Sequence, residues 1–94
     1  MYVLFLYNGL SLGWVPFQHY IEISIISYYN AEYNIEVSVG DKQDKLDRVV
    51  SIHKYGDEPS LEDIIKFFET DVLFKLYPRY VPTYDYEIID YRRY

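Results

Sequence analysis

The 94-residue sequence predicts a single α+β domain, residues 1–94, in which a four- to five-stranded, mostly antiparallel sheet has one helix packed across a face. Several segments alternate apolar and polar residues with a period of two, which is typical of strands with one buried face. One segment instead repeats its apolar residues every three or four positions, as a helix does. The length suits one core between two layers of secondary structure.

The chain begins with an apolar segment, residues 2–7. This segment is too short to span a bilayer and lacks the basic residues that precede the core of a signal peptide, so we interpret it as a strand. Because both of its faces are apolar, we expect it to lie centrally in the sheet. Residues 10–18 follow as a loop, whose apolar side chains, Trp14 among them, are expected to be covered.

The next segments predict a three-stranded meander. Residues 20–28 and 33–39 alternate as strands and flank a turn in which Asn30 can adopt a positive φ. The alternation slips at Ile25 and Ile26, which indicates a bulge or a strand end. A polar loop at residues 40–45 then leads to a third strand at residues 47–55.

The helix is the best-marked element. Ser60 is a good N-cap, and Glu62 and Asp63 place negative charge in the first turn. The helix cannot continue far beyond Tyr77 because Pro78 follows. Its predicted core stripe consists of Leu61, Ile64, Ile65, Phe68, Val72 and Leu76.

Two further phenylalanines, Phe67 and Phe74, flank this stripe. They indicate a helix that is buried on more than one side or that contacts a second chain. A last strand is predicted at residues 84–88, and residues 91–94 either extend it or fray.

The composition is unusual. Thirteen residues are tyrosine, whereas cysteine is absent and alanine and methionine occur once each. Few amides, no cysteine and little methionine are typical of heat-adapted proteins. In size and composition the chain resembles the small orphan proteins of viruses that infect hyperthermophilic archaea. No motif contributes to this resemblance, which assigns no functional residue but implies a role in virion assembly or in binding host machinery.

The formal net charge of −6 disfavours binding to nucleic acid and favours a basic protein partner. Without cysteine the chain has no disulfide, no thiolate metal site and no cysteine nucleophile. Its glycines are isolated and form no phosphate-binding pattern, so we predict no cofactor.

One candidate site is the outward face of the predicted strands. Its carboxylates are Glu22, Glu36, Asp85 and Glu87. If the helix covers the other face, these groups form an open acidic surface. Such a surface is either a solvated face or a docking site for a basic partner, such as a nucleic-acid-binding protein whose own site would be blocked.

A second candidate site is the C-terminal region, which is rich in tyrosine and arginine. Both residue types are frequent at binding hot spots. The alternatives are that the tyrosines only cover a sheet edge, or that the region stacks single-stranded bases, which the net charge opposes. The candidate residues are Tyr80, Tyr84, Tyr91, Arg92 and Arg93.

The two histidines, His19 and His53, show no metal-ligand spacing, and we predict no metal site. Ser51 and His53 share one face of a predicted strand, with Glu22 or Glu36 on neighbouring strands. This arrangement leaves open a small hydrolase that uses His53 and nearby carboxylates. No nucleophile motif marks either position, so the sequence favours a protein that is not an enzyme.

We therefore expect a viral or mobile-element accessory protein that binds a host protein in the host cytoplasm and inhibits it. The excess of apolar surface predicts a homodimer, and the protein is not expected at a membrane. The alternative is a structural or assembly protein of the virion that acts through self-association.

Overall fold

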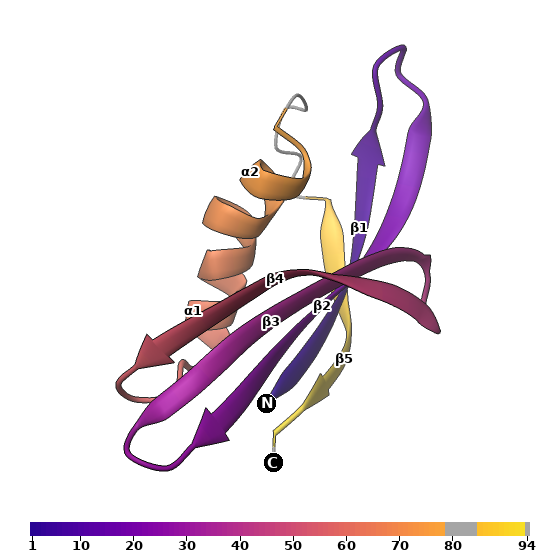
Figure 1. Cartoon of the computed structure of the whole chain (residues 1–94). Helices are drawn as coiled ribbons and strands as arrows, with labels where there is room; N and C mark the ends of the chain where they lie inside the picture. Colours follow the sequence, from indigo (N-terminus) through magenta and orange to yellow (C-terminus); the bar gives the residue numbers. More distant parts are fainter. Residues whose placement is uncertain (79–84, 94) are drawn as a thin grey trace.

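The computed structural model describes residues 1–78 and 85–93. Figure 1 shows a twisted sheet with a helical segment beside it. The sheet contains five strands in the order β4-β3-β2-β1-β5, and every neighbouring pair is antiparallel. The α+β class and the antiparallel sheet of five strands are therefore as predicted. The strands are β1 (Tyr2–Leu10), β2 (Pro16–Tyr28), β3 (Glu32–Lys42), β4 (Lys45–Tyr55) and β5 (Tyr86–Arg92).

The apolar strand β1 lies inside the sheet, as expected, between β2 and β5. Its odd-numbered side chains, such as Val3 and Phe5, belong to the main core. Leu4 points to the opposite face and is nevertheless 0% exposed. Burial on both faces explains why this strand has no alternation of apolar and polar residues.

Strands β2, β3 and β4 form the predicted meander, but their hairpins are longer than the sequence indicated. The polar loop expected at residues 40–45 shrinks to a tight turn, because β3 runs to Lys42 and β4 begins at Lys45. Gly40 permits this approach, since a Cβ atom there would lie 2.1 Å from the carbonyl oxygen of Lys45. The predicted slip at Ile25 and Ile26 is wrong, because both keep regular partners on β3.

The helix begins as predicted at Ser60, whose side chain and that of Asp63 form a capping box. It runs through α1 (Leu61–Phe67), a π-helical turn η1 (Phe68–Val72) and α2 (Leu73–Leu76). Within the π turn the N–H of Leu73 donates to the carbonyl oxygen of Phe68. This longer spacing rotates the following turn, so Leu73 is buried and Leu76 only partly so.

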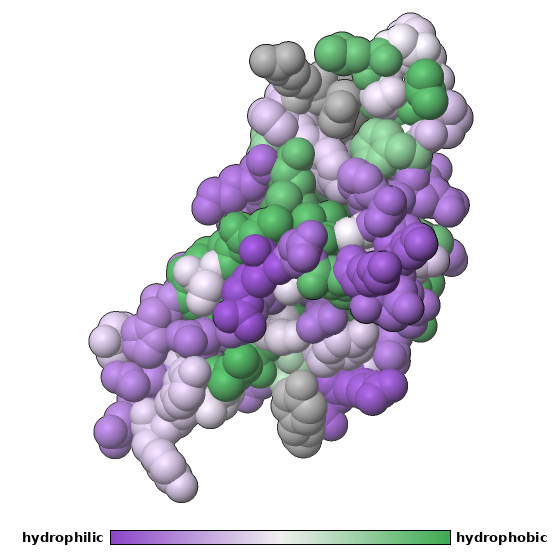
Figure 2. Space-filling view, turned by 45° about the vertical axis from the view of Figure 1, so that its right-hand side comes forward, coloured by the Kyte–Doolittle hydropathy of each residue, from purple (hydrophilic) through white to green (hydrophobic). Residues whose placement is uncertain are grey.

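The prediction for the loop at residues 10–18 is wrong. Strand β1 extends to Leu10 and β2 begins at Pro16, so the two strands form a long hairpin closed by residues 11–15. The apolar side chains of this turn are uncovered, with Trp14 81% exposed. Figure 2 shows apolar residues gathered at the upper end of the molecule, where this hairpin ends.

The last strand, β5, begins later than predicted and includes part of the tail. It pairs with β1 through a register shift between Leu4 and Phe5. Its first residue, Tyr86, donates its hydroxyl hydrogen to Glu69 of the π turn. Burial, followed by the hydrogen bond and the charge of Glu69, raises the pKa of Tyr86 to about 12. This contact ties β5 to the helical segment.

Candidate protein-binding surface

Strand register brings the predicted carboxylates of three strands to one face of the sheet. Glu22 lies opposite Leu4 of β1, and Leu4 in turn lies opposite Asp90 of β5. Side chains at paired positions of neighbouring strands project from the same face. This face is the one opposite the core residues of β1, and we call it the acidic face. Its charged residues include Glu22, Glu36, Arg48, Glu87, Asp90 and Arg92.

The carboxylates of this face differ in their ion pairs and hydrogen bonds. Glu36 is paired with Arg48 at 3.2 Å, and its side chain is only 13% exposed. Asp90, which the sequence reading did not single out, is paired with Arg92 at 3.4 Å. Glu22 accepts a hydrogen bond of 2.9 Å from the Ser24 hydroxyl and has no basic partner among the described residues.

Glu87 and Asp85 occupy the β5 edge of the sheet. Glu87 lies opposite Leu6 of β1 and is exposed. Asp85 directly precedes β5, and its carbonyl oxygen accepts a hydrogen bond of 2.9 Å from the N–H of Asn8. Neither carboxylate forms an ion pair within residues 1–78 and 85–93.

The predicted tyrosine and arginine residues of the C-terminal region do not all lie together. Tyr91 is opposite Val3, on the side of the main core, whereas Arg92 is opposite Tyr2 on the acidic face. The Arg92 guanidinium carbon lies 5.9 Å from the centre of the Tyr2 ring. Arg93 follows the end of β5 and is exposed. Tyr80 and Tyr84 lie outside the described residues.

Aromatic and apolar residues of the acidic face were missed by the sequence reading. Tyr2 and Leu6 of β1 and Tyr20 of β2 are half-buried there, around the fully buried Leu4. The sequence predicted that both faces of β1 are apolar, but it did not place these residues beside the predicted carboxylates. Tyrosines around an apolar centre, with charges at the edge, are typical of protein interfaces.

His53 belongs to a hydrogen-bonded chain at the far end of the same face. Its Nδ1 lies 2.6 Å from the Asn34 side-chain oxygen, and the Asn34 amide donates to the Tyr28 hydroxyl at 3.2 Å. An amide oxygen only accepts hydrogen bonds, so Nδ1 of His53 carries the hydrogen. Ser51, the nearest serine along the strand, has no hydrogen bond to His53 in the described part of the chain. Hydrolysis through His53 therefore gains no support from a paired nucleophile.

His19 occupies a different environment, which nothing in the local sequence indicated. Its Nδ1 lies 2.6 Å from the Tyr77 hydroxyl oxygen, and the two residues are 58 positions apart in the chain. The rings of Tyr7 and Phe17 also pack against Tyr77. Burial lowers the pKa of His19, and the charge of Asp41 opposes this shift. The described His, Asp and Glu residues nowhere form a group of three that could bind a metal ion.

In the part of the chain that the structure describes, no helix combines the length and the hydropathy needed to cross a membrane. Compared with known proteins, the chain matches no family model, no curated protein and no solved structure.

Proposed function

We propose that the protein acts by binding, without catalysis, and that its acidic face docks onto a basic surface of a partner protein. The observation that carries the proposal is the convergence of Glu22 and Glu87 on one face of the sheet without basic partners among the described residues. Fixed carboxylates on a rigid sheet attract a cationic partner and increase its rate of association.

The surroundings of these carboxylates support a contact rather than a solvated face. Tyr2, Leu6 and Tyr20 provide half-buried aromatic and apolar area beside Glu22. Burial of such residues supplies affinity, whereas the charges at the edge mainly supply specificity and rate. The proposal takes the helical segment as the cover of the opposite face, which leaves the acidic face free for the partner.

The compositional resemblance to orphan proteins of archaeal viruses suggests the kind of partner. An accessory protein of this class would work in the host cytoplasm. It would bind a host protein that needs a basic surface for the host protein's own function. A nucleic-acid-binding protein has such a surface, and occupation by the acidic face would inhibit it. The partner is thus proposed as a basic protein rather than nucleic acid itself.

The test is a capture experiment with host lysate in which charge is removed from the acidic face. The variant carries Glu22→Gln, Asp85→Asn and Glu87→Gln, which neutralise the three carboxylates that have no described basic partner. We expect it to lose basic proteins that the unaltered chain retains, and we expect raised salt to release them from the unaltered chain.

A matched control distinguishes the effect of the acidic face from the effect of the total charge. Asp44→Asn, Asp57→Asn and Glu62→Gln change the net charge by the same amount at exposed positions away from the acidic face. This control should recover partners as well as the unaltered chain does. Equal recovery by both variants would contradict the proposal, because net charge or another surface would then account for binding.

A further inference from the structure

A second surface, separate from the acidic face, lies at the end of the β1–β2 hairpin. We call residues 11–15 the hairpin tip. Leu12, Trp14 and Val15 are 70%, 81% and 59% exposed. The tip contains no charged residue, and the first one in the chain is Glu22. An uncharged, apolar projection of this kind marks an interaction site more often than a solvated turn.

The hairpin tip has a defined conformation. The N–H of Ser11 donates to the carbonyl oxygen of Val15 at 2.9 Å, and the N–H of Trp14 donates to that of Ser11 at 2.9 Å. Trp14 has a φ of 64°, which is unfavourable for a residue with a bulky side chain. The backbone of the tip therefore has a fixed conformation at an energetic cost, and a pre-organised backbone loses little entropy on binding.

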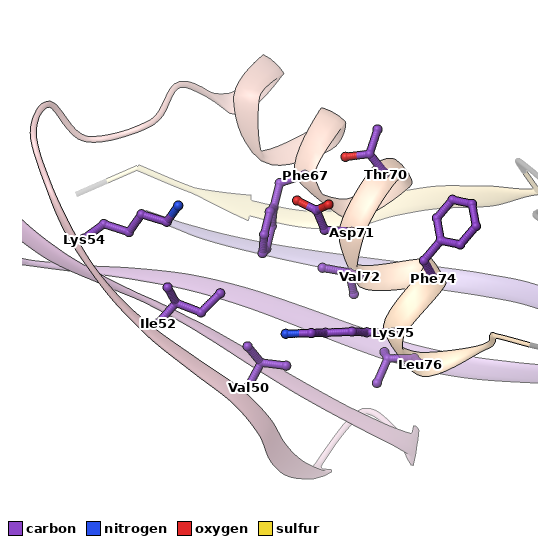
Figure 3. A pocket seen from close by; sticks show the side chains of 10 residues that line it. All are labelled: Val50, Ile52, Lys54, Phe67, Thr70, Asp71, Val72, Phe74, Lys75 and Leu76. Carbon is purple, nitrogen blue, oxygen red and sulfur yellow. The ribbon is translucent and has the colours of Figure 1, made fainter.

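The same chain contains an apolar groove that is open to solvent. We call it the helix groove: a concavity of about 380 Å³ between β4 and the helical segment (Figure 3). Figure 3 shows Val50 and Ile52 pointing from β4 toward the helical segment and the Phe67 ring descending opposite them. A volume of this size lies within the range of pockets that enclose one small ligand.

Two lysines and one acidic residue, Asp71, line the helix groove. The side chains of Lys54 and Lys75 extend into it from opposite walls (Figure 3). Neither ammonium group forms an ion pair with any residue that the structure describes. A cation next to an apolar wall attracts the face of an aromatic ring, and tryptophan is the best such ring.

We propose that the hairpin tip of one copy of this chain docks into the helix groove of a second copy, with Trp14 as the anchor. The tip supplies the uncharged aromatic ring. The groove supplies apolar walls, two cations that can lie against the face of that ring, and the carboxylate of Asp71, which can accept the indole N–H. One contact then buries both apolar surfaces, and each chain carries both halves of it. A second copy is therefore a partner whose surface has the complementary chemistry. The contact goes beyond binding through the acidic face and uses different residues.

Each contact joins two different patches, the tip of one copy and the groove of another. It differs from a contact in which two hairpin tips pack on each other. A tip-to-groove contact predicts that a chain without the tip still accepts the tip of another chain. This property permits a direct test.

Trp14 is the only tryptophan of the chain, so fluorescence excited selectively at tryptophan, and not at the thirteen tyrosines, reports on the hairpin tip. We expect the emission of Trp14 to move to shorter wavelength as the protein is concentrated, together with an increase in mass by light scattering. Phe74→Glu alters an exposed residue of the helix groove and should weaken this association by about tenfold or more. Tyr29→Glu makes the same charge change in the exposed β2–β3 turn and should leave it unchanged.

The decisive experiment mixes two defective variants. Trp14→Ser keeps the helix groove but has no tryptophan, and Phe74→Glu keeps the tip but has an altered groove. Each should be monomeric alone. Addition of Trp14→Ser to Phe74→Glu should shift the fluorescence of the latter and produce a heterodimer. Lys75→Glu, at another exposed groove position, replaces Phe74→Glu if circular dichroism shows that the latter has lost its fold.

Three results would overturn the proposal. The first is an emission that does not change with concentration. The second is an unchanged concentration-dependent shift in Phe74→Glu and Lys75→Glu, which would mean that two tips pack together. The third is a shift seen only with phosphatidylcholine vesicles, which would identify the tip as a membrane contact.

Discussion

The rings of Phe5 and Phe68 lie parallel, with their centres 4.0 Å apart and an interplanar angle of 2°. Phe5 comes from β1 and Phe68 from the first position of the π turn, and both are fully buried. Tyr86 of β5 packs edge-on against both rings. This three-ring cluster therefore joins the helical segment to two neighbouring strands of the sheet.

Removal of the Phe68 ring should destabilise the protein strongly. Phe68→Ala leaves a cavity next to Phe5 and Tyr86, and we expect a loss of roughly 3–5 kcal/mol in the free energy of unfolding. Urea denaturation measures it. Phe74→Ala, on the same helical segment but 59% exposed, is the matched control and should cost less than about 1 kcal/mol when the chain is dilute. Similar losses in both variants would show that Phe68 is not part of the core.

The acidic face was the part of the candidate site that sequence could predict. Strands β2 and β3 alternate regularly around Glu22 and Glu36, and β5 does so around Glu87 before its register shift. Side-chain direction in a regular stretch of strand follows from position alone. The sequence could not show that Glu36 is largely covered by its pairing with Arg48 on β4. That contact depends on the register of the β3–β4 hairpin, which shifts between Val37 and Ser38.

The errors arose where packing between distant segments decides the structure. The π turn changes which face of the helix is buried, and no local sequence pattern near Phe68 or Leu73 indicates this turn. The hairpin tip was expected to be covered because Trp14 is apolar, yet it projects beyond the sheet. Similarly, the proximity of His19 to Tyr77 follows from the helix end meeting β2.

The His19 environment predicts a pH dependence of stability. Burial holds the pKa of His19 below its ordinary value, so the folded state favours the neutral ring and the unfolded state does not. The contribution of His19 to the stability of the fold is complete above its pKa of about 6.5 in the unfolded state. It is lost as the pH falls through the lower pKa of the folded state. We expect the melting temperature to fall from neutral pH to pH of about 5, in part through this residue.

The variant His19→Gln isolates the share of this pH dependence that comes from His19. The difference in melting temperature between this variant and the unaltered chain should shrink as the pH is lowered, because the unaltered chain then loses its advantage. His53→Gln removes an exposed histidine from β4 and serves as the matched control. A difference for His19→Gln that stays constant over the same pH range would exclude burial of a neutral His19 ring as a source of stability.

The β2–β3 turn offers a stabilising change. Asn30 and Ala31 both have positive φ, at 66° and 54°. The sequence reading predicted this conformation for Asn30, which tolerates it, whereas the Cβ of alanine makes it unfavourable. Ala31→Gly removes the steric conflict, although it also increases the entropy of the unfolded chain. We expect a net gain of up to about 1 kcal/mol in the free energy of unfolding, measured by urea denaturation.

Ala31→Val is the opposing variant and should lower stability, because a β-branched residue is least compatible with positive φ. Equal stability of the glycine and valine variants would mean that the turn does not require the left-handed conformation at residue 31.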